Sequence, residues 1–141
     1  MKYKKQPYNI EQQVFGMKKL YPQFKVFNKT KYSVSFVGEL KVADEFQKYK
    51  ISINFRGNDH PIAKVLSPKL VDNPPHYYKD PGCLCLYHPR LFKWKREKLI
   101  SKEIIPLIAT WIYFYEVWLQ TGKWYGPEAP HDLNELKKLE Q

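Results

Sequence analysis

The sequence predicts one α+β domain that spans residues 1–141, and three stretches carry this prediction. Residues 9–20 place apolar side chains at the spacing of an amphipathic helix. Residues 24–66 alternate apolar and polar side chains with the period of strands, and residues 101–120 are apolar on nearly every side, as in a buried helix. We expect an N-terminal helix, an antiparallel sheet and a long core helix, in that order.

The N-terminal helix is predicted from its cap and its apolar face. Asn9 is a suitable N-cap, and Gln12 stands three residues later in an imperfect form of the capping-box pattern. Tyr21-Pro22 is expected to end the helix. Because the opposite face is polar, we expect a surface helix that lies on the sheet. The apolar face consists of Ile10, Val14, Met17 and Leu20.

The sheet is predicted from strand-like runs that are separated by short turn sequences. The second run contains Gly38, which we expect to interrupt it. Strands of this length and spacing predict an antiparallel meander of about four strands. The runs cover residues 24–28, 32–42, 49–55 and 62–66.

The core helix has a predicted start, a possible break and a predicted end. Ser101 is a possible N-cap, and Pro106 is expected either to kink the helix or to move its start later. Thr121-Gly122 is expected to end it. Residues 124–131 then predict a loop, and Asp132 is a possible cap for a short C-terminal helix.

Composition limits the classes of partner and compartment. Twenty-four Lys and Arg against 14 Asp and Glu give a formal charge of +10, which favours an acidic partner. Nucleic acid is not favoured, because no nucleic-acid-binding motif accompanies the charge. The N-terminus is followed by no apolar signal core, and the longest apolar stretch is shorter than the ~20 residues of a membrane span. We expect a reduced, cytoplasmic protein.

The candidate site lies between Asn73 and Trp94. This stretch contains both cysteines, two histidines and several prolines, together with Gly82, and it shows no helical periodicity. Proline and glycine fix the shape of a loop, and such loops commonly display catalytic or binding groups. We therefore interpret this stretch as the site and the rest of the chain as its scaffold.

Three chemistries are compatible with the residues of this stretch. Cys85 is a candidate nucleophile, with Cys83 expected to face the other way. Zinc binding by these two cysteines with His76 and His88 is a poor match to the usual ligand spacing. A Cys-His hydrolase would need one of His76, His88 or His131 beside the cysteine. The alternative to all three is that the cysteines are small, buried, apolar residues and that each histidine is an ordinary surface or structural residue. No motif implies a metal or a soluble cofactor.

The order of elements and the local sequence around Cys85 resemble those of a known family. A Pro/His loop is followed by Gly-x-Leu-Cys-Leu, and Trp94 stands nine residues after the cysteine. This resembles the ubiquitin-conjugating enzyme fold over about the first 120 residues. Pro-His-Tyr-Tyr, Gly-Cys-Leu-Cys-Leu-Tyr and Tyr-x-x-Trp-Leu-x-Thr-Gly-x-Trp, with a later Pro-His, are similar to the bacterial branch of type II CBASS anti-phage operons, in its stand-alone short form.

The resemblance implies acyl transfer at Cys85. In that branch the cysteine forms a thioester with the C-terminus of a partner, a cGAS/DncV-like nucleotidyltransferase, and a lysine or other amine then attacks it. The resembled family places His-Pro-Asn before the cysteine, whereas this chain has Pro75-His76-Tyr77. Removal of one oxyanion donor typically costs ~10²–10³ in rate, so His76, Tyr77 or a backbone amide must replace the Asn, or the enzyme is slow. We expect His76 in this role and Tyr77 second, the alternative being that both only pack the loop.

Further residues are weighed beside these. By the same resemblance His131 and Trp124 are expected to fold back over Cys85, although Trp124 is equally suited to seal the core. Lys79 and Arg90 flank the loop and are candidates for docking an acidic tail or for solvated surface charges. The alternative function is a catalytically silent module that holds the nucleotidyltransferase or another acidic partner without a covalent bond.

Overall fold

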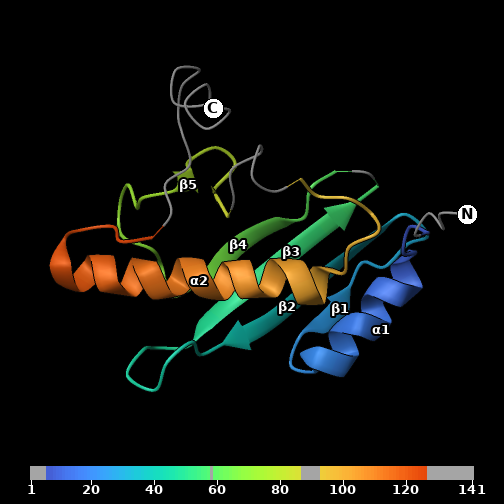
Figure 1. The fold of residues 1–141 in the computed structure, drawn as a ribbon, viewed down its shortest axis with the longest axis horizontal. Helices are drawn as coiled ribbons and strands as arrows, with labels where there is room; N and C mark the ends of the chain where they lie inside the picture. The colour runs from blue at the N-terminus through green and yellow to red at the C-terminus, as the bar shows by residue number, and fades with distance from the viewer. Residues whose placement is uncertain (1–5, 58, 87–92, 127–141) are drawn as a thin grey trace, which may run out of the picture.

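The structure is a computed structural model that describes residues 6–57, 59–86 and 93–126. A four-stranded antiparallel sheet is packed on one face by the long helix α2 (Ile100–Thr121), which crosses the strands, and α1 (Ile10–Leu20) lies at one end (Figure 1). The α+β prediction is therefore confirmed in its order of elements. Among the described residues, no helix is long and apolar enough to cross a membrane.

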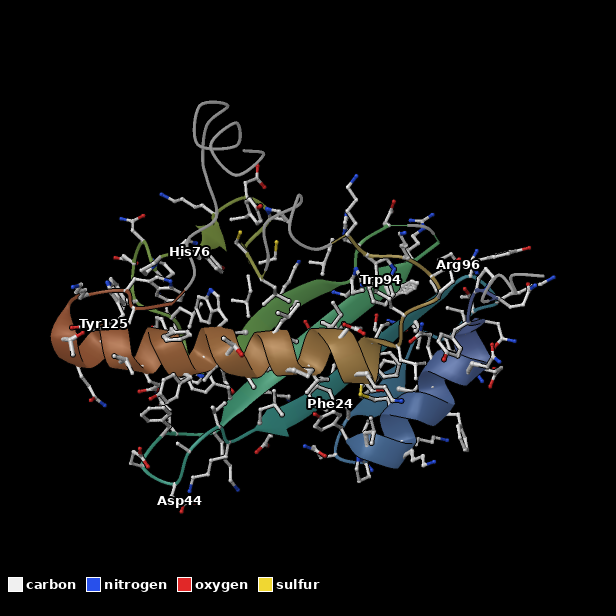
Figure 2. All side chains as sticks on the ribbon, in the orientation of Figure 1. Phe24, Asp44, His76, Trp94, Arg96 and Tyr125 are labelled. Carbon is white, nitrogen blue, oxygen red and sulfur yellow. The ribbon has the colours of Figure 1, made fainter. Side chains whose placement is uncertain are left out.

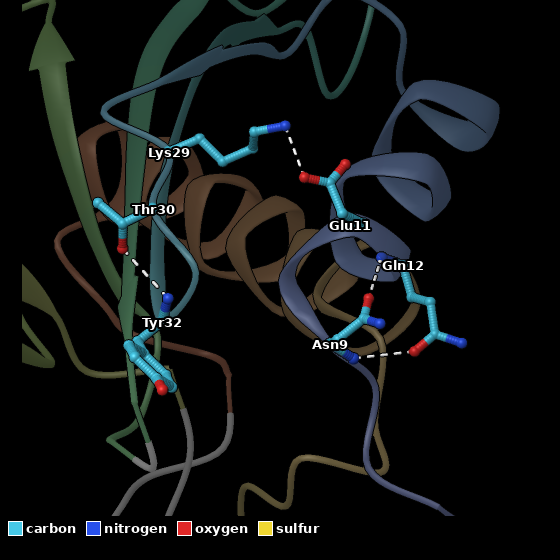
Figure 3. A network of polar contacts seen from close by, with 6 residues as sticks. All are labelled: Asn9, Glu11, Gln12, Lys29, Thr30 and Tyr32. Carbon is cyan, nitrogen blue, oxygen red and sulfur yellow. Dashed lines mark hydrogen bonds and ion pairs between the residues drawn. The ribbon is translucent and has the colours of Figure 1, made fainter.

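Helix α1 begins with the capping box that the sequence indicates (Figure 3). The Asn9 side chain accepts a hydrogen bond from the Gln12 backbone at 2.8 Å, and the Gln12 side chain accepts one from the Asn9 backbone at 2.9 Å. Ile10, Val14 and Met17 are buried as expected. Leu20 is 45% exposed, so the prediction that it belongs to the buried face is wrong.

Helix α1 contacts the start of α2, and its buried residues share one core with residues of the sheet. The buried Gln13 makes this contact specific. Its amide nitrogen donates to the Lys98 carbonyl at 2.9 Å, and its amide oxygen accepts from the Ile100 backbone at 2.9 Å. A side chain from α1 therefore satisfies a backbone donor at the N-terminus of α2.

The sheet contains β1 (Lys25–Phe27), β2 (Ser33–Leu40), β3 (Tyr49–Arg56) and β4 (Ile62–Ser67), in the order β1-β2-β3-β4. Each neighbouring pair is antiparallel, so the predicted meander is confirmed. Phe36, Ile53 and Ala63 pair across three strands and are buried. This row is one part of the sheet's contribution to the core, which the sheet shares with α2.

Gly38 does not interrupt β2, contrary to expectation. The strand runs through it, with Gly38 paired to Ile51. A Cβ atom at this position would lie 2.6 Å from the ring of Phe24, closer than real Cβ contacts. Glycine is therefore present so that Phe24 can pack on the strand.

Helix α2 starts without the cap that the sequence suggests. Its N-cap is Leu99, which makes no side-chain capping bond, and Ser101 is buried inside the first turn. The Ser101 hydroxyl has no hydrogen-bond partner within the described part of the chain. The prediction of Ser101 as the cap is wrong because the helix begins one residue earlier, at Ile100, whose backbone N–H donates to the side chain of Gln13 on α1.

Pro106 neither ends α2 nor delays its start. The helix continues through Pro106, which is exposed. Gly122 ends the helix as predicted, with a φ of 74° that favours glycine and a backbone N–H that donates to the Trp118 carbonyl at 2.7 Å. The C-terminal helix predicted after Asp132 lies outside the described residues.

The core also holds the carboxylate of Glu116 on α2. It accepts hydrogen bonds from the hydroxyl of Tyr49 and, at 3.2 Å, from the side-chain amide of Gln47. Burial, reinforced by the bond to Glu116, raises the pKa of Tyr49 far above its ordinary value. The pair therefore ties α2 to β3 by a buried polar contact.

Candidate functional site

The candidate site is built on a small hairpin that follows β4. Strand β5 (Tyr77–Tyr78) pairs antiparallel with β6 (Cys83–Leu84), and β6 lies against β4. The turn between them closes with a hydrogen bond from the Gly82 N–H to the Tyr78 carbonyl at 2.9 Å. Gly82 has a φ of 94°, so its lack of a side chain is required there. The hairpin fixes Cys85 at the end of β6.

His76 holds the backbone of Cys85 in place. Its carbonyl oxygen accepts a hydrogen bond from the Cys85 N–H at 2.9 Å and a second from the indole N–H of Trp111, also at 2.9 Å. His76 has a φ of 51°, a conformation that is uncommon for a residue with a side chain. Such strain costs about 1–3 kcal/mol and is typical of functional loops. The two hydrogen bonds offset it.

Two stacked aromatic residues of α2 anchor the loop that leads to the hairpin. The rings of Trp111 and Tyr115 lie 5.0 Å apart and nearly parallel. Trp111 donates to His76, and the Tyr115 hydroxyl accepts from the Val71 N–H at 3.0 Å. Burial raises the pKa of Tyr115, the Val71 bond opposes this shift and Glu116 adds to it. Two successive turns of α2 thus hold the same loop, one at Val71 and the other at His76.

The side chain of His76 packs on Trp124, which lies beyond α2. The two ring centroids are 4.8 Å apart, and Figure 2 shows His76 between α2 and the β5 strand. Trp124 also contacts Trp111 and Phe114, at 6.2 and 5.9 Å. Trp124 therefore packs against the core, as one alternative expects, and on the ring of His76; its place over Cys85 stays a prediction.

The thiol of Cys85 is half-buried at a small cavity of about 190 Å³. Its sulfur lies 3.5 Å from the hydroxyl oxygen of Tyr78, to which the thiol donates a hydrogen bond. Apolar residues, Pro61, Ile62 and Leu84, line the same cavity. A reactive sulfur at such a place can be reached from solvent while its surroundings are largely apolar.

Cys83 shares this cavity, so the prediction that it faces away from Cys85 is wrong. In an extended segment, residues two positions apart point to the same side. Cys83 is buried, and burial raises the pKa of its thiol, while the charge of Lys64 lowers it and Cys85 raises it. Its thiolate is disfavoured by this burial, which makes Cys83 the less suitable nucleophile.

The other predicted site residues are placed differently. Tyr77 lines a separate groove with Lys79, and a Cβ at Gly82 would meet its hydroxyl at 3.1 Å. His88, Arg90 and His131 lie outside the described residues. Among the residues that are described, no group of three or more His, Cys, Asp or Glu side chains could hold a metal ion.

Sequence reasoning missed Tyr78, Trp111 and Tyr115 as parts of the site. Asp80-Pro81-Gly82 between Tyr78 and Cys83 is a turn signal that could have predicted a hairpin, and hence a tyrosine opposite the cysteines. The aromatic pair at i and i+4 on the core helix suggested only packing. Nothing in the sequence indicated which backbone groups the two rings would bind.

Comparison with known proteins identifies the family. Residues 13–132 match the family described as "Type II CBASS E2 protein". A search of curated proteins gave no match. The family match covers most of the chain and includes the hairpin with Cys85 and the whole of α2. This chain therefore belongs to the type II CBASS E2 proteins, a family associated with anti-phage defence.

Proposed function

We propose that this protein is an acyl-transfer enzyme whose nucleophile is Cys85. The thiolate attacks the activated C-terminal carbonyl of a partner protein, the bond from this carbonyl to its activating group breaks, and a thioester forms. An amine, such as a lysine, then displaces the sulfur as a thiolate. The observation that carries the proposal is the setting of Cys85. Its backbone is held by His76, its sulfur is accessible at a cavity, and a hydroxyl lies 3.5 Å away.

The fold and the family support this chemistry. An N-terminal helix, a four-stranded meander and a long core helix agree with the ubiquitin-conjugating-enzyme-like fold that the resemblance implies. The partner we propose is the C-terminus of a cGAS/DncV-like nucleotidyltransferase in the same operon. The charge of +10 suits an acidic partner surface, and the reduced thiol suits the cytoplasm.

We assign the role of the missing Asn to His76 first and Tyr77 second. His76 is adjacent to Cys85 through the bond from the Cys85 N–H to its carbonyl, which supports a place beside the reacting sulfur. The proposed role of His131 rests on the resemblance alone. His76→Ala is compared with His76→Gly, because glycine adopts a positive φ without strain. A loss of thioester formation and discharge in both variants supports the imidazole; unchanged rates in both exclude it.

The alternative is a catalytically silent module that holds the same partner without a covalent bond. It is favoured by Pro75-His76-Tyr77 in place of His-Pro-Asn. The two functions are separated by intact mass and non-reducing gel mobility after co-expression with the neighbouring nucleotidyltransferase. An adduct that is absent in Cys85→Ala but present in Cys83→Ala supports acyl transfer. Co-purification without an adduct in any variant supports the silent module.

A further inference from the structure

We infer that Tyr78 is a catalytic residue of the acyl transfer, and that its hydroxyl hydrogen-bonds the Cys85 sulfur whenever this sulfur carries negative charge. The inference rests on the proposed function and adds Tyr78, a residue to which the family resemblance assigned no role. Its basis is a direct contact, because the hydroxyl oxygen of Tyr78 lies 3.5 Å from the sulfur of Cys85. Sulfur is larger than oxygen, so this distance is compatible with a hydrogen bond.

The backbone holds the two groups together from both sides. Tyr78 of β5 is paired with Cys83 of β6, and Cys85 follows two residues later on the same side of the chain. The Cys85 N–H is bonded to the carbonyl of His76, two residues before Tyr78. The tyrosine and the cysteine therefore belong to one hydrogen-bonded hairpin, and their contact does not depend on the position of a free loop.

The exposure of Tyr78 fits a group that acts on a bound substrate. Its side chain is 52% exposed, and it lines the cavity of about 190 Å³ together with the cysteine. A tyrosine that only packed the interior would be buried like Tyr49 and Tyr115. Tyr78 instead brings its hydroxyl to the mouth of a cavity, where an incoming acyl carbonyl must also approach.

The chemistry follows from the two-way hydrogen bonding of a phenol, which both accepts and donates. With a neutral thiol, the S–H donates to the Tyr78 oxygen, as in this structure. When the S–H bond breaks and its proton passes to water, the hydroxyl can turn and donate to the thiolate. Hydrogen bonds to an ionised group are about twice as strong as neutral ones. The thiolate is the nucleophile, so this bond increases the reactive fraction of Cys85.

The same bond assists discharge of the thioester. The amine nitrogen attacks the carbonyl carbon, a C–N bond forms and the C–S bond breaks, while the excess amine proton passes to water. The electron pair of the broken bond stays on the Cys85 sulfur, which leaves as a thiolate. The sulfur of a thioester is uncharged and a weak acceptor, so the bond strengthens as the transition state develops. An interaction that is stronger in the transition state than before it raises the rate.

The first test measures thiol reactivity alone and needs no partner. In a Cys83→Ala background Cys85 is the single thiol of the chain, so its alkylation by iodoacetamide can be followed by intact mass. Tyr78→Phe keeps the ring and removes the hydroxyl, and it is expected to slow alkylation about three- to tenfold at neutral pH. Tyr113→Phe is the matched control, since Tyr113 is exposed on α2 and packs against Phe46.

The second test measures the transfer with a small acyl donor, the mercaptoethanesulfonate thioester of acetylglycine. Acylation of Cys85 and its discharge by hydroxylamine are timed separately. Tyr78→Phe is expected to slow both steps about tenfold, with a thermal midpoint equal to that of the background protein. A residue that served only the structure would instead lower the midpoint.

Rates for Tyr78→Phe that equal the background would overturn the inference. A loss in Tyr77→Phe with none in Tyr78→Phe would also overturn it, because the hydroxyl beside Gly82 would then be the one that acts. These outcomes are distinct from failure of the proposed function. In that case Tyr78→Phe would still slow alkylation of Cys85, while no covalent adduct with the nucleotidyltransferase would form in any variant.

Discussion

The indole N–H of Trp111 donates to the carbonyl oxygen of His76 at 2.9 Å, and this bond joins the core helix to the loop that carries the site. The same carbonyl accepts the Cys85 N–H. One oxygen therefore connects α2 to the backbone of the proposed nucleophile. The position of Cys85 is set by the core, although the residues around it belong to an irregular segment.

Trp111→Phe is expected to lower the free energy of unfolding by about 1–2 kcal/mol, the cost of one lost hydrogen bond with some lost packing. It is also expected to slow alkylation of Cys85, because the carbonyl of His76 loses its anchor on α2. Trp118→Phe is the control. Trp118 packs on Tyr115 from the same helix, and within the described part of the chain its indole N–H makes no hydrogen bond. Equal rates of Cys85 alkylation in Trp111→Phe and Trp118→Phe would contradict the anchoring role of Trp111.

Gly82→Ala is expected to destabilise the hairpin, because an alanine at φ 94° is strained and its Cβ would meet the Tyr77 hydroxyl at 3.1 Å. Gly57→Ala is the matched control, since Gly57 also has a positive φ but no atom within 4 Å of an added Cβ. Both variants should lose about 1 kcal/mol or more of stability in urea denaturation. Only Gly82→Ala should change the alkylation rate of Cys85; a change in both would point to global loosening.

Asn9→Ala is expected to cost about 1 kcal/mol of stability, the usual effect of removing an N-cap. Because Asn9 and Gln12 bond each other's backbone, we compare the single variants Asn9→Ala and Gln12→Ala with the double variant. If the two bonds act as one unit, the loss of stability in the double variant should be smaller than the sum of the losses in the two single variants. Strict additivity would mean that each side chain caps α1 alone.

Stability is expected to fall as the pH rises above about 10, the pKa of an unfolded tyrosine. Burial raises the pKa of both Tyr49 and Tyr115 in the folded state. Above this pH the unfolded chain loses protons that the folded chain retains, so each such tyrosine lowers the free energy of unfolding by at most about 1.4 kcal/mol per pH unit. Tyr49→Phe should make this slope shallower in urea denaturation from pH 9 to 11. An unchanged slope would show that Tyr49 is not responsible.

The elements of this fold could be predicted because their signals are local. The capping box at Asn9, the alternation in the four strands and Gly122 at the end of α2 each follow from residues that are close in sequence. Ser101 failed as a cap because α2 already begins at Ile100, whose N–H donates to Gln13 in another helix. Gly38 failed as a break because the reason for glycine is the ring of Phe24. Contacts between distant segments decided both cases.

The site was predicted only in part for the same reason. The composition around Cys85 marked the segment, and the family motif pointed to the cysteine. The partners of His76 and Cys85 come from α2 and from β5, and no local pattern predicts which backbone carbonyl a tryptophan will bind. The contact of Tyr78 with Cys85 depends on hairpin register, which becomes visible once Tyr78 is paired with Cys83.

The most direct test of the central claim compares the bond formed by wild type with that formed by Cys85→Ser after co-expression with the nucleotidyltransferase. A thioester at Cys85 predicts a wild-type adduct that thiols and hydroxylamine cleave. It predicts for Cys85→Ser an oxyester of nearly the same mass that thiols leave intact and mild alkali cleaves. An adduct that resists thiols in the wild type, or that persists in Cys85→Ala, would contradict acyl transfer through this cysteine.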